Sequence, residues 1–127
     1  MQNIGSNRRN ALYLKIKPSP MNYKIEPDKL NWDAGKVKGF LGKEFLKLDN
    51  GGVKLVKIEA QSVYPEHIHP DKTEYAFVVD GTPSFVINNE LFTSKMGDFF
   101  IFPSGMKHAI KNETDIICHL LVGSIQV

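Results

Sequence analysis

The sequence has one cysteine, no long apolar stretch and no strong excess of either charge. A single cysteine, Cys118, cannot form an internal disulfide, and its place in the mostly apolar run 116–122 favours a buried and unreactive thiol. The lack of a cysteine pair fits a reducing compartment, so we expect a cytoplasmic protein. The apolar runs are far shorter than the roughly 18 to 20 residues that cross a membrane, which excludes an integral membrane protein.

The charge is nearly balanced: 16 Lys and Arg against 14 Asp and Glu give a net charge of +2. Residues 1–20 contain four basic residues and no acidic one, so subtracting their +4 leaves −2 for residues 21–127. Because nucleic-acid-binding proteins usually carry a concentrated basic surface on the fold itself, we expect no nucleic-acid partner. We interpret residues 1–20 as a basic N-terminal arm, which could be a targeting segment, a partner-binding extension or residues upstream of a start at Met21.

The length of 127 residues suits one domain, which we assign to residues 21–127. Pro27 predicts one short helical turn, with Leu30 and Trp32 on its buried face. Beyond it, short segments rich in valine, isoleucine and phenylalanine alternate with turn signals made of Gly, Asn, Asp and Pro. This spacing predicts an all-β domain, either a sandwich, a closed barrel or a jelly roll. The predicted strands lie at about 37–48, 53–60, 62–69, 74–79, 83–88, 91–94, 98–102, 107–112 and 116–123.

Three histidines and one glutamate form the most informative pattern in the chain. His67 and His69 are two residues apart in a predicted strand, so they point to the same face. A turn at residues 70–71 brings the chain back with Glu74 as the first inward residue of the next strand, and His108 begins a later strand. Three imidazoles and one carboxylate are a mixed nitrogen and oxygen set that suits one divalent transition metal ion. They do not distinguish iron, manganese, nickel, copper, cobalt and zinc.

Each part of this set also has an ordinary explanation, because histidines near a turn and a carboxylate at a strand start are usually solvated. Their conjunction is more specific. Four polar groups aimed into a small β domain would be destabilising without a partner, and a metal ion supplies that partner. Four protein ligands leave two octahedral positions open, which is typical of catalytic rather than structural metal sites.

The chain resembles the cupin superfamily, whose two motifs are written G-x5-H-x-H-x(3 or 4)-E-x6-G and G-x5-P-x-G-x2-H-x3-N. One position departs from the first motif, since Gln61 stands where the leading glycine is expected. The resemblance covers about residues 40–123 and implies a jelly-roll cupin barrel (a double-stranded β-helix) with the site inside and a short N-terminal extension. It also implies that His67, His69, Glu74 and His108 bind the metal. The matching residues are His67, His69, Glu74 and Gly81 in the first motif, and Gly97, Pro103, Gly105, His108 and Asn112 in the second.

Cupins of this kind include iron dioxygenases, manganese decarboxylases, and isomerases or lyases that use a metal as a Lewis acid. We expect a metal-dependent enzyme, with dioxygenase activity on a small organic molecule favoured. The alternatives are a Lewis-acid isomerase or decarboxylase, and a non-enzymatic metal- or ligand-sensing module that uses Arg8 and Arg9 to dock a partner. An apolar cavity wall is expected from Val63, Val78, Phe100, Phe102, Met106 and Ile110.

Other residues near the motifs receive secondary assignments. His119 is interpreted as a core residue or a supporting partner of a ligand, and no general acid or base is assigned. The outward face formed by Tyr75, Phe77 and Val79 is unusually apolar and predicts a homodimer interface, with cover by the second sheet or by the N-terminal arm as the alternative. Solvent exposure is expected for Glu66, Lys72 and Lys107.

Overall fold

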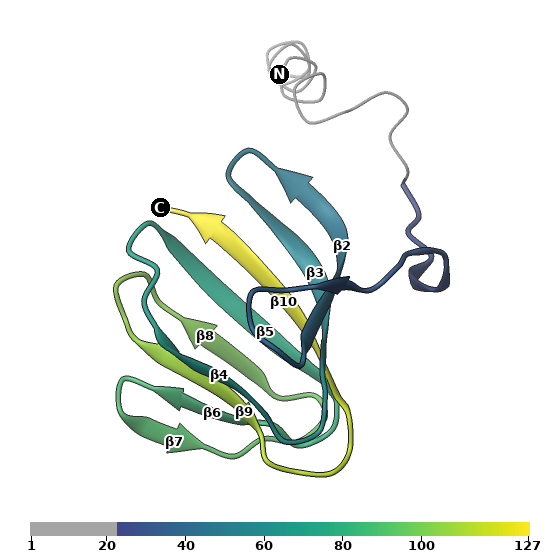
Figure 1. Ribbon diagram of the computed structural model, residues 1–127. Coiled ribbons are helices and arrows are strands. Elements are labelled where there is room, and N and C mark those ends of the chain that lie inside the picture. The colour runs from purple at the N-terminus through teal and green to yellow at the C-terminus, as the bar shows by residue number, and fades with distance from the viewer. Residues whose placement is uncertain (1–22) are drawn as a thin grey trace.

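Strands make up almost all of the regular structure of the protein (Figure 1). The structure is a computed structural model that describes residues 23–127; the basic arm of residues 1–20 and Met21 lie outside this part. A single 3-10 turn, η1 (Pro27–Lys29), precedes the strands. The strands are β1 (Asp33–Ala34), β2 (Phe40–Leu48), β3 (Gly51–Ile58), β4 (Ser62–His67), β5 (Lys72–Asp80), β6 (Ser84–Ile87), β7 (Glu90–Phe92), β8 (Phe99–Phe102), β9 (His108–Asn112) and β10 (Cys118–Gln126).

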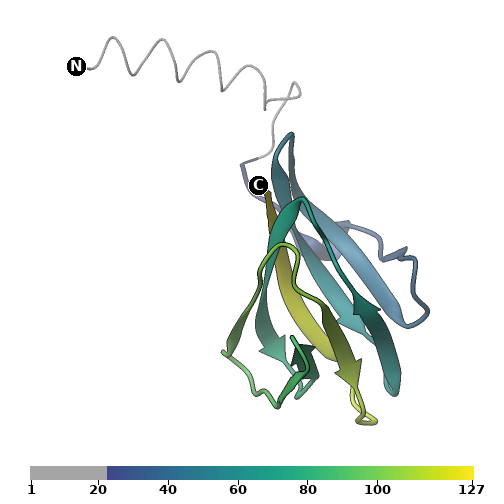
Figure 2. The same cartoon turned by 90° about the vertical axis from the view of Figure 1, so that its left-hand side faces the viewer.

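The strands form two antiparallel sheets that enclose one core, as the predicted jelly roll requires (Figures 1 and 2). The larger sheet has the order β1-β2-β3-β10-β5-β8, and the smaller has the order β4-β9-β6-β7. From β3 onward, each strand lies in the other sheet from the one before it, except that β6 and β7 share the small sheet, so β4 and β5 belong to different sheets. The two parts of the predicted metal site therefore lie on opposite walls of the barrel.

Alternation along β5 shows how the sequence selects the inner face. Ala76 and Val78 are fully buried, whereas Phe77 and Val79 between and after them stay 40% and 37% exposed. Cys118 is also fully buried, as predicted, and this burial raises the pKa of its thiol. The core consists of Phe40, Ile58, Ala76, Val78, Phe85, Phe102, Cys118 and Leu120.

The predicted strands shift by one to three residues at one or both ends, and two differences change the environment of named residues. The turn at Pro27 is confirmed, but its three residues bury nothing, and Leu30 and Trp32 lie beyond it and are half-buried. The last strand begins at Cys118 rather than at residue 116, and Ile116 is 70% exposed. The Asn112 carboxamide donates a hydrogen bond to the Ile116 carbonyl at 2.8 Å, which uses residue 116 in a turn instead of a strand.

The outer face of the large sheet is only partly covered within residues 23–127. The segment around Trp32 packs over β2 and β3, where the Lys43 and Lys57 ammonium groups lie 4.5 and 4.7 Å from the Trp32 ring centroid. Phe77 and Val79 lie on the same outer face and remain exposed. The small sheet packs against the inner face, so it does not cover them, and the homodimer interface stays a prediction. No helix in the described residues is long and apolar enough to cross a membrane.

Candidate metal centre

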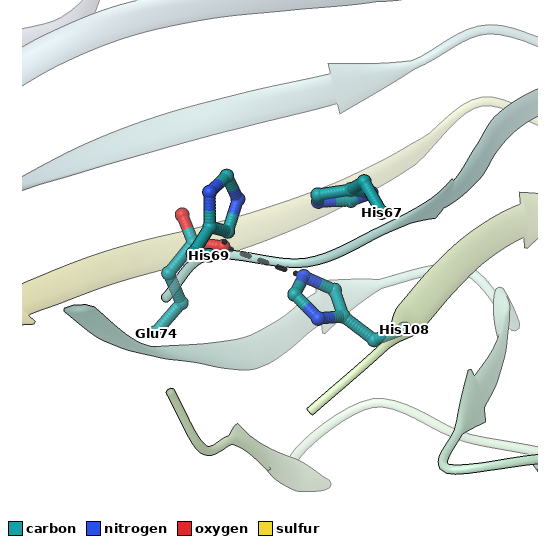
Figure 3. A group of neighbouring side chains, drawn as sticks. All are labelled: His67, His69, Glu74 and His108. Atoms are coloured by element: carbon teal, nitrogen blue, oxygen red, sulfur yellow. Dashed lines mark ion pairs between the residues drawn. The ribbon is translucent and has the colours of Figure 1, made fainter. Parts of the chain in front are cut away.

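The four predicted ligands come together from both sheets (Figure 3). His67 ends β4, His69 lies in the loop after it, and His108 begins β9, which pairs with β4 so that His67 stands opposite His108. Glu74 lies on the inner face of β5 in the large sheet, two residues before Ala76. Three imidazoles from the small-sheet side thus face one carboxylate from the large sheet.

An extra residue in β4 aims His67 inward. Tyr64 pairs with Ile110 and His67 pairs with His108, so three steps on β4 match two steps on β9. This is a β-bulge, and Pro65 within it lies where a strand tolerates the loss of a backbone N–H. Because of the bulge, both Tyr64 and His67 face the interior, and their rings lie 4.7 Å apart.

The loops that carry the two motifs are hydrogen-bonded to each other. The Gly105 backbone N–H donates to the His69 carbonyl at 2.9 Å, and the Ser104 N–H donates to the Thr73 hydroxyl at 3.2 Å. Gly105 has a φ of +76°, which glycine adopts without steric cost. These bonds fix the loop that precedes His108 beside the loop that carries His69, and so they hold the ligands of both motifs together.

Hydrogen bonds to backbone carbonyls also orient two of the imidazoles. The Nδ1 atom of His67 lies 2.8 Å from the Pro65 carbonyl oxygen, and Nδ1 of His108 lies 3.3 Å from that of Met106. A carbonyl can only accept, so each Nδ1 carries a proton, and whenever the imidazole is neutral its Nε2 is the atom with the free lone pair. This is the arrangement by which proteins present Nε2 of histidine to a metal ion.

The distances between the ligand atoms suit a single ion. Nε2 of His69 and Nε2 of His108 lie 3.2 and 3.5 Å from Oε1 of Glu74, and all four ligand atoms lie within 4.8 Å of one another. Ligands bonded to one ion at about 2.1 Å are separated by at most about 4.2 Å, so a contraction of roughly half an ångström would complete the site. The residues present therefore fit a divalent transition metal ion.

The protonation states favour the same conclusion. Burial lowers the pKa of the His69 imidazole below its ordinary value, against an opposing effect of the nearby Glu74 charge. For the Glu74 carboxyl, burial alone would raise the pKa, but the hydrogen bond from His108 and the charges of His69 and Lys72 together lower it. Both groups are thus biased toward the unprotonated forms that bind metals.

Comparison with known proteins agrees with this fold. The family model of the cupin domain matches residues 54–123. The chain belongs to the cupin family. Germin-like protein subfamily 2 member 4 of Arabidopsis thaliana is 39% identical to this cupin over 103 residues, which are 76% of this chain and 43% of that protein. Germin-like protein 5-1 of Oryza sativa subsp. japonica is 37% identical over 75 residues, or 54% of this chain and 34% of its own. The cupin spans less than half the length of these curated relatives.

Solved structures share the fold at low sequence identity. A predicted oxalate decarboxylase of Thermotoga maritima superposes with a TM-score of 0.76 at 18% identity, covering 82% of this cupin and 99% of that chain. A sugar phosphate isomerase of Silicibacter pomeroyi superposes with a TM-score of 0.73 at 22% identity, covering 82% of this cupin and 76% of that chain. At these identities the likeness establishes the jelly roll and not the reaction.

A cavity of about 320 Å³ opens beside the four ligands of this cupin. Phe102 and Ile110 line it, as predicted. Val63 does not, because the bulge in β4 turns it outward, where it is 47% exposed, and Tyr64 takes the inward position. Val78 and Phe100 do not line it either, because they belong to the core or pack against it. Met106 is also not part of the cavity wall; its backbone carbonyl accepts a hydrogen bond from His108. The apolar wall consists of Phe40, Leu41, Val56, Phe102, Ile110, Leu120 and Val122.

His119 has neither of the predicted roles. It pairs in register with Lys57 on the outer face of the large sheet, and its Nδ1 lies 2.8 Å from the Asp80 carboxylate. Its ring lies 5.9 Å from that of Trp32. The interpretation as a core or ligand-supporting residue is wrong, because the apolar neighbours of His119 in the sequence do not reveal which face of β10 it occupies.

Three other predictions meet mixed outcomes. Glu66 is exposed, as expected, but Lys107 is half-buried. The prediction that Lys72 is solvent-exposed is wrong: its ammonium lies 3.7 Å from Glu74 Oε2 and its side chain lines the cavity. Gln61, at the position of the missing glycine, keeps the left-handed backbone with a φ of +58°. Its side chain donates a hydrogen bond to Asp115 at 3.0 Å, which fastens it to the β9–β10 turn.

Proposed function

We propose that this cupin is a metal-dependent enzyme that acts on a small organic molecule inside the barrel, and that the reaction is a dioxygenation. His67, His69, Glu74 and His108 would hold the ion. When bound, a divalent transition ion supplies a Lewis acid and, for iron, access to oxygen chemistry. The observation that carries the proposal is the convergence of three imidazoles and one carboxylate at a cavity large enough for a small ligand.

The composition of the cavity wall supports oxidation over proton-transfer chemistry. Within the described residues, the titratable side chains that line this cavity, besides the four ligands, are Tyr64 and three lysines. No second carboxylate or imidazole is left there, so among residues 23–127 only Tyr64 and the lysines could serve as the general base that isomerisation by proton transfer demands. A reaction on this substrate would therefore depend on the chemistry of the ion, while the aromatic and aliphatic wall holds the substrate and excludes water.

A Lewis-acid isomerase or decarboxylase is the second candidate, since a sugar phosphate isomerase and a predicted oxalate decarboxylase share this fold. The third, a sensing module docked through Arg8 and Arg9, depends on residues outside the described part.

The first experiment measures metal binding to the full chain under anaerobic conditions with Fe(II), Mn(II) and Co(II). We expect one ion per chain. His108→Ala should lose more than the roughly 10- to 100-fold in affinity that removing a supporting partner costs. His119→Ala is the matched control, because it deletes the remaining imidazole of the four in the chain at a position outside the site. Equal affinity in the two variants would contradict the proposal.

The second experiment separates the reactions. The iron-loaded chain is incubated with a panel of small organic acids and phenols, and oxygen uptake is recorded together with product formation. Uptake stoichiometric with product supports a dioxygenase. Turnover without oxygen uptake identifies a Lewis-acid enzyme, and metal binding without turnover or an open coordination position favours the sensing module.

A further inference from the structure

Three lysines surround the mouth of the metal cavity. Lys36 comes from the loop between β1 and β2, Lys54 from β3 and Lys72 from the start of β5. All three line the 320 Å³ cavity and also the adjoining outer hollow of about 540 Å³. They therefore stand where the cavity opens to solvent, on the path that a ligand must take to the metal centre.

The placement of Lys54 is unusual for a lysine in a sheet. In β3 it pairs with Val122 of β10, whose side chain lines the cavity, so Lys54 lies on the inner face of the barrel. Lys57, three residues along the same strand, lies on the outer face over Trp32. The strand thus places one lysine on the face that lines the cavity, where its side chain stays exposed at the rim.

The cavity has too few acidic groups to neutralise these lysines. Among residues 23–127, Glu74 is the only carboxylate that lines it, and it pairs with Lys72 at 3.7 Å. Within residues 23–127, Lys36 and Lys54 form no ion pair, although Glu44 and Asp71 line the outer hollow. A divalent ion on the four ligands would add two further positive charges. Converging positive charge in a partly enclosed site attracts anions and raises their local concentration.

We infer that Lys36, Lys54 and Lys72 form an anion subsite, and that the substrate is an organic acid with two ends. One end chelates the metal ion, and the other carries a carboxylate or phosphate that the lysines bind by charge-assisted hydrogen bonds. This inference rests on the proposed function, because it assigns the substrate class of the same cavity. The simplest alternative is that the lysines extend into water and bind nothing.

Four α-hydroxy acids provide matched probes, since all share one metal-chelating end. Lactate has no second anionic group, malate has a carboxylate, and 3-phosphoglycerate has a phosphate. The 4-methyl ester of malate has nearly the size of malate without its second charge. Binding to the Co(II)-loaded full chain is measured by calorimetry, and the visible spectrum of cobalt reports chelation independently of catalysis.

We expect malate or 3-phosphoglycerate to bind at least about tenfold tighter than lactate and the methyl ester. The tighter of the two identifies the anionic group as carboxylate or phosphate. Lys54→Met and Lys36→Met should each weaken binding of that acid about three- to tenfold and leave the methyl ester unchanged. Lys54→Arg should restore most of the lost affinity, and raising the salt concentration should weaken only the doubly charged probes.

Lys57→Met is the control, because it removes the same charge from the opposite face of β3. Lys36 is in a loop, so Lys36→Met tests the subsite even if a change in β3 impairs folding. Equal affinity for malate, 3-phosphoglycerate and the methyl ester, or lysine variants that bind them like Lys57→Met, would overturn the anion subsite while the metal site stands. A wild-type chain that binds no cobalt would instead overturn the proposed function itself.

Discussion

Replacing Asn112 by alanine should destabilise the domain more than any other change of a single polar side chain outside the metal centre. Asn112 is fully buried. Its Nδ2 lies 3.2, 3.1 and 2.8 Å from the carbonyl oxygens of Ile58, Glu59 and Ile116, and its Oδ1 accepts from the Thr114 N–H at 3.1 Å and hydroxyl at 2.7 Å. One carboxamide therefore joins the end of β3 to the whole turn between β9 and β10.

The expected loss follows from these contacts. A hydrogen bond contributes a net 0.5 to 1.5 kcal/mol, roughly, and the partners left unpaired in the interior add to the cost. With four or so bonds removed, the free energy of unfolding should fall by about 3 to 5 kcal/mol. For a domain of this length, that corresponds to a decrease of about 10 to 15 °C in the melting temperature. Since domains are stable by only about 5 to 15 kcal/mol, Asn112→Ala should be close to unfolding at 37 °C.

Urea denaturation monitored by the fluorescence of Trp32, the single tryptophan, together with calorimetry, measures both quantities. Glu113→Ala is the control, because it changes the adjacent exposed residue of the same turn. Asn112→Asp keeps the acceptor but places a carboxylate against three carbonyl oxygens, so it should be at least as unstable as alanine. If Asn112→Ala stays within about 1 kcal/mol of Glu113→Ala, the turn does not depend on this carboxamide and the reasoning is wrong.

Three further predictions concern other features. Gln61 has a positive φ, and both Gln61→Gly and Gln61→Ala lose its side-chain hydrogen bonds. Only glycine adopts this φ without steric cost, so Gln61→Gly should be about 1 kcal/mol more stable than Gln61→Ala in urea denaturation. Equal stability of the two variants would contradict this. The pKa values of His69 and Glu74 are lowered in the folded state, so the unfolded chain binds more protons in acid. The melting temperature of the metal-free chain should therefore fall as the pH drops below 6.5 and again below 4.5, and the first step should be smaller in His69→Gln. Phe77→Glu, on the exposed outer face, should convert a dimer into a monomer in sedimentation at micromolar concentration, and a wild-type monomer would eliminate the dimer.

The four candidate ligands could be found from the sequence because their spacing matches the two cupin motifs. The predicted strand through His67 and His69 ends at His67 in the structure and His69 lies in the following loop, whereas Glu74 shares the inner face of β5 with the buried Ala76, as predicted. The spacing of His108 after a glycine and proline turn gives the third imidazole a place at a strand start. The four residues that converge in the structure were also the four predicted, although the bulge in β4 that aims His67 inward was not.

Other assignments failed because they depend on register, which the sequence does not encode locally. Because of the bulge in β4, Tyr64 and not Val63 lies on the inner face. In the sequence of this segment, only Pro65 indicates that a bulge is present. The inward direction of Lys54 and the outward direction of His119 follow from pairings of β3 and β10 over more than 60 positions of the chain. A prediction made strand by strand therefore identifies the ligands and misses the lysines at the mouth of the cavity.

The division of the ligands between the sheets has a consequence for the metal-free protein. The three imidazoles are on the side of β4 and β9, and of the four residues only Glu74 comes from the large sheet. Between β4 and β5 the chain runs through the loop that carries His69, whose carbonyl is bonded to Gly105. An ion bound to all four ligands would therefore cross-link the two sheets at the open end of the barrel, where the apolar core gives way to polar side chains. Binding of the ion should therefore also stabilise the fold.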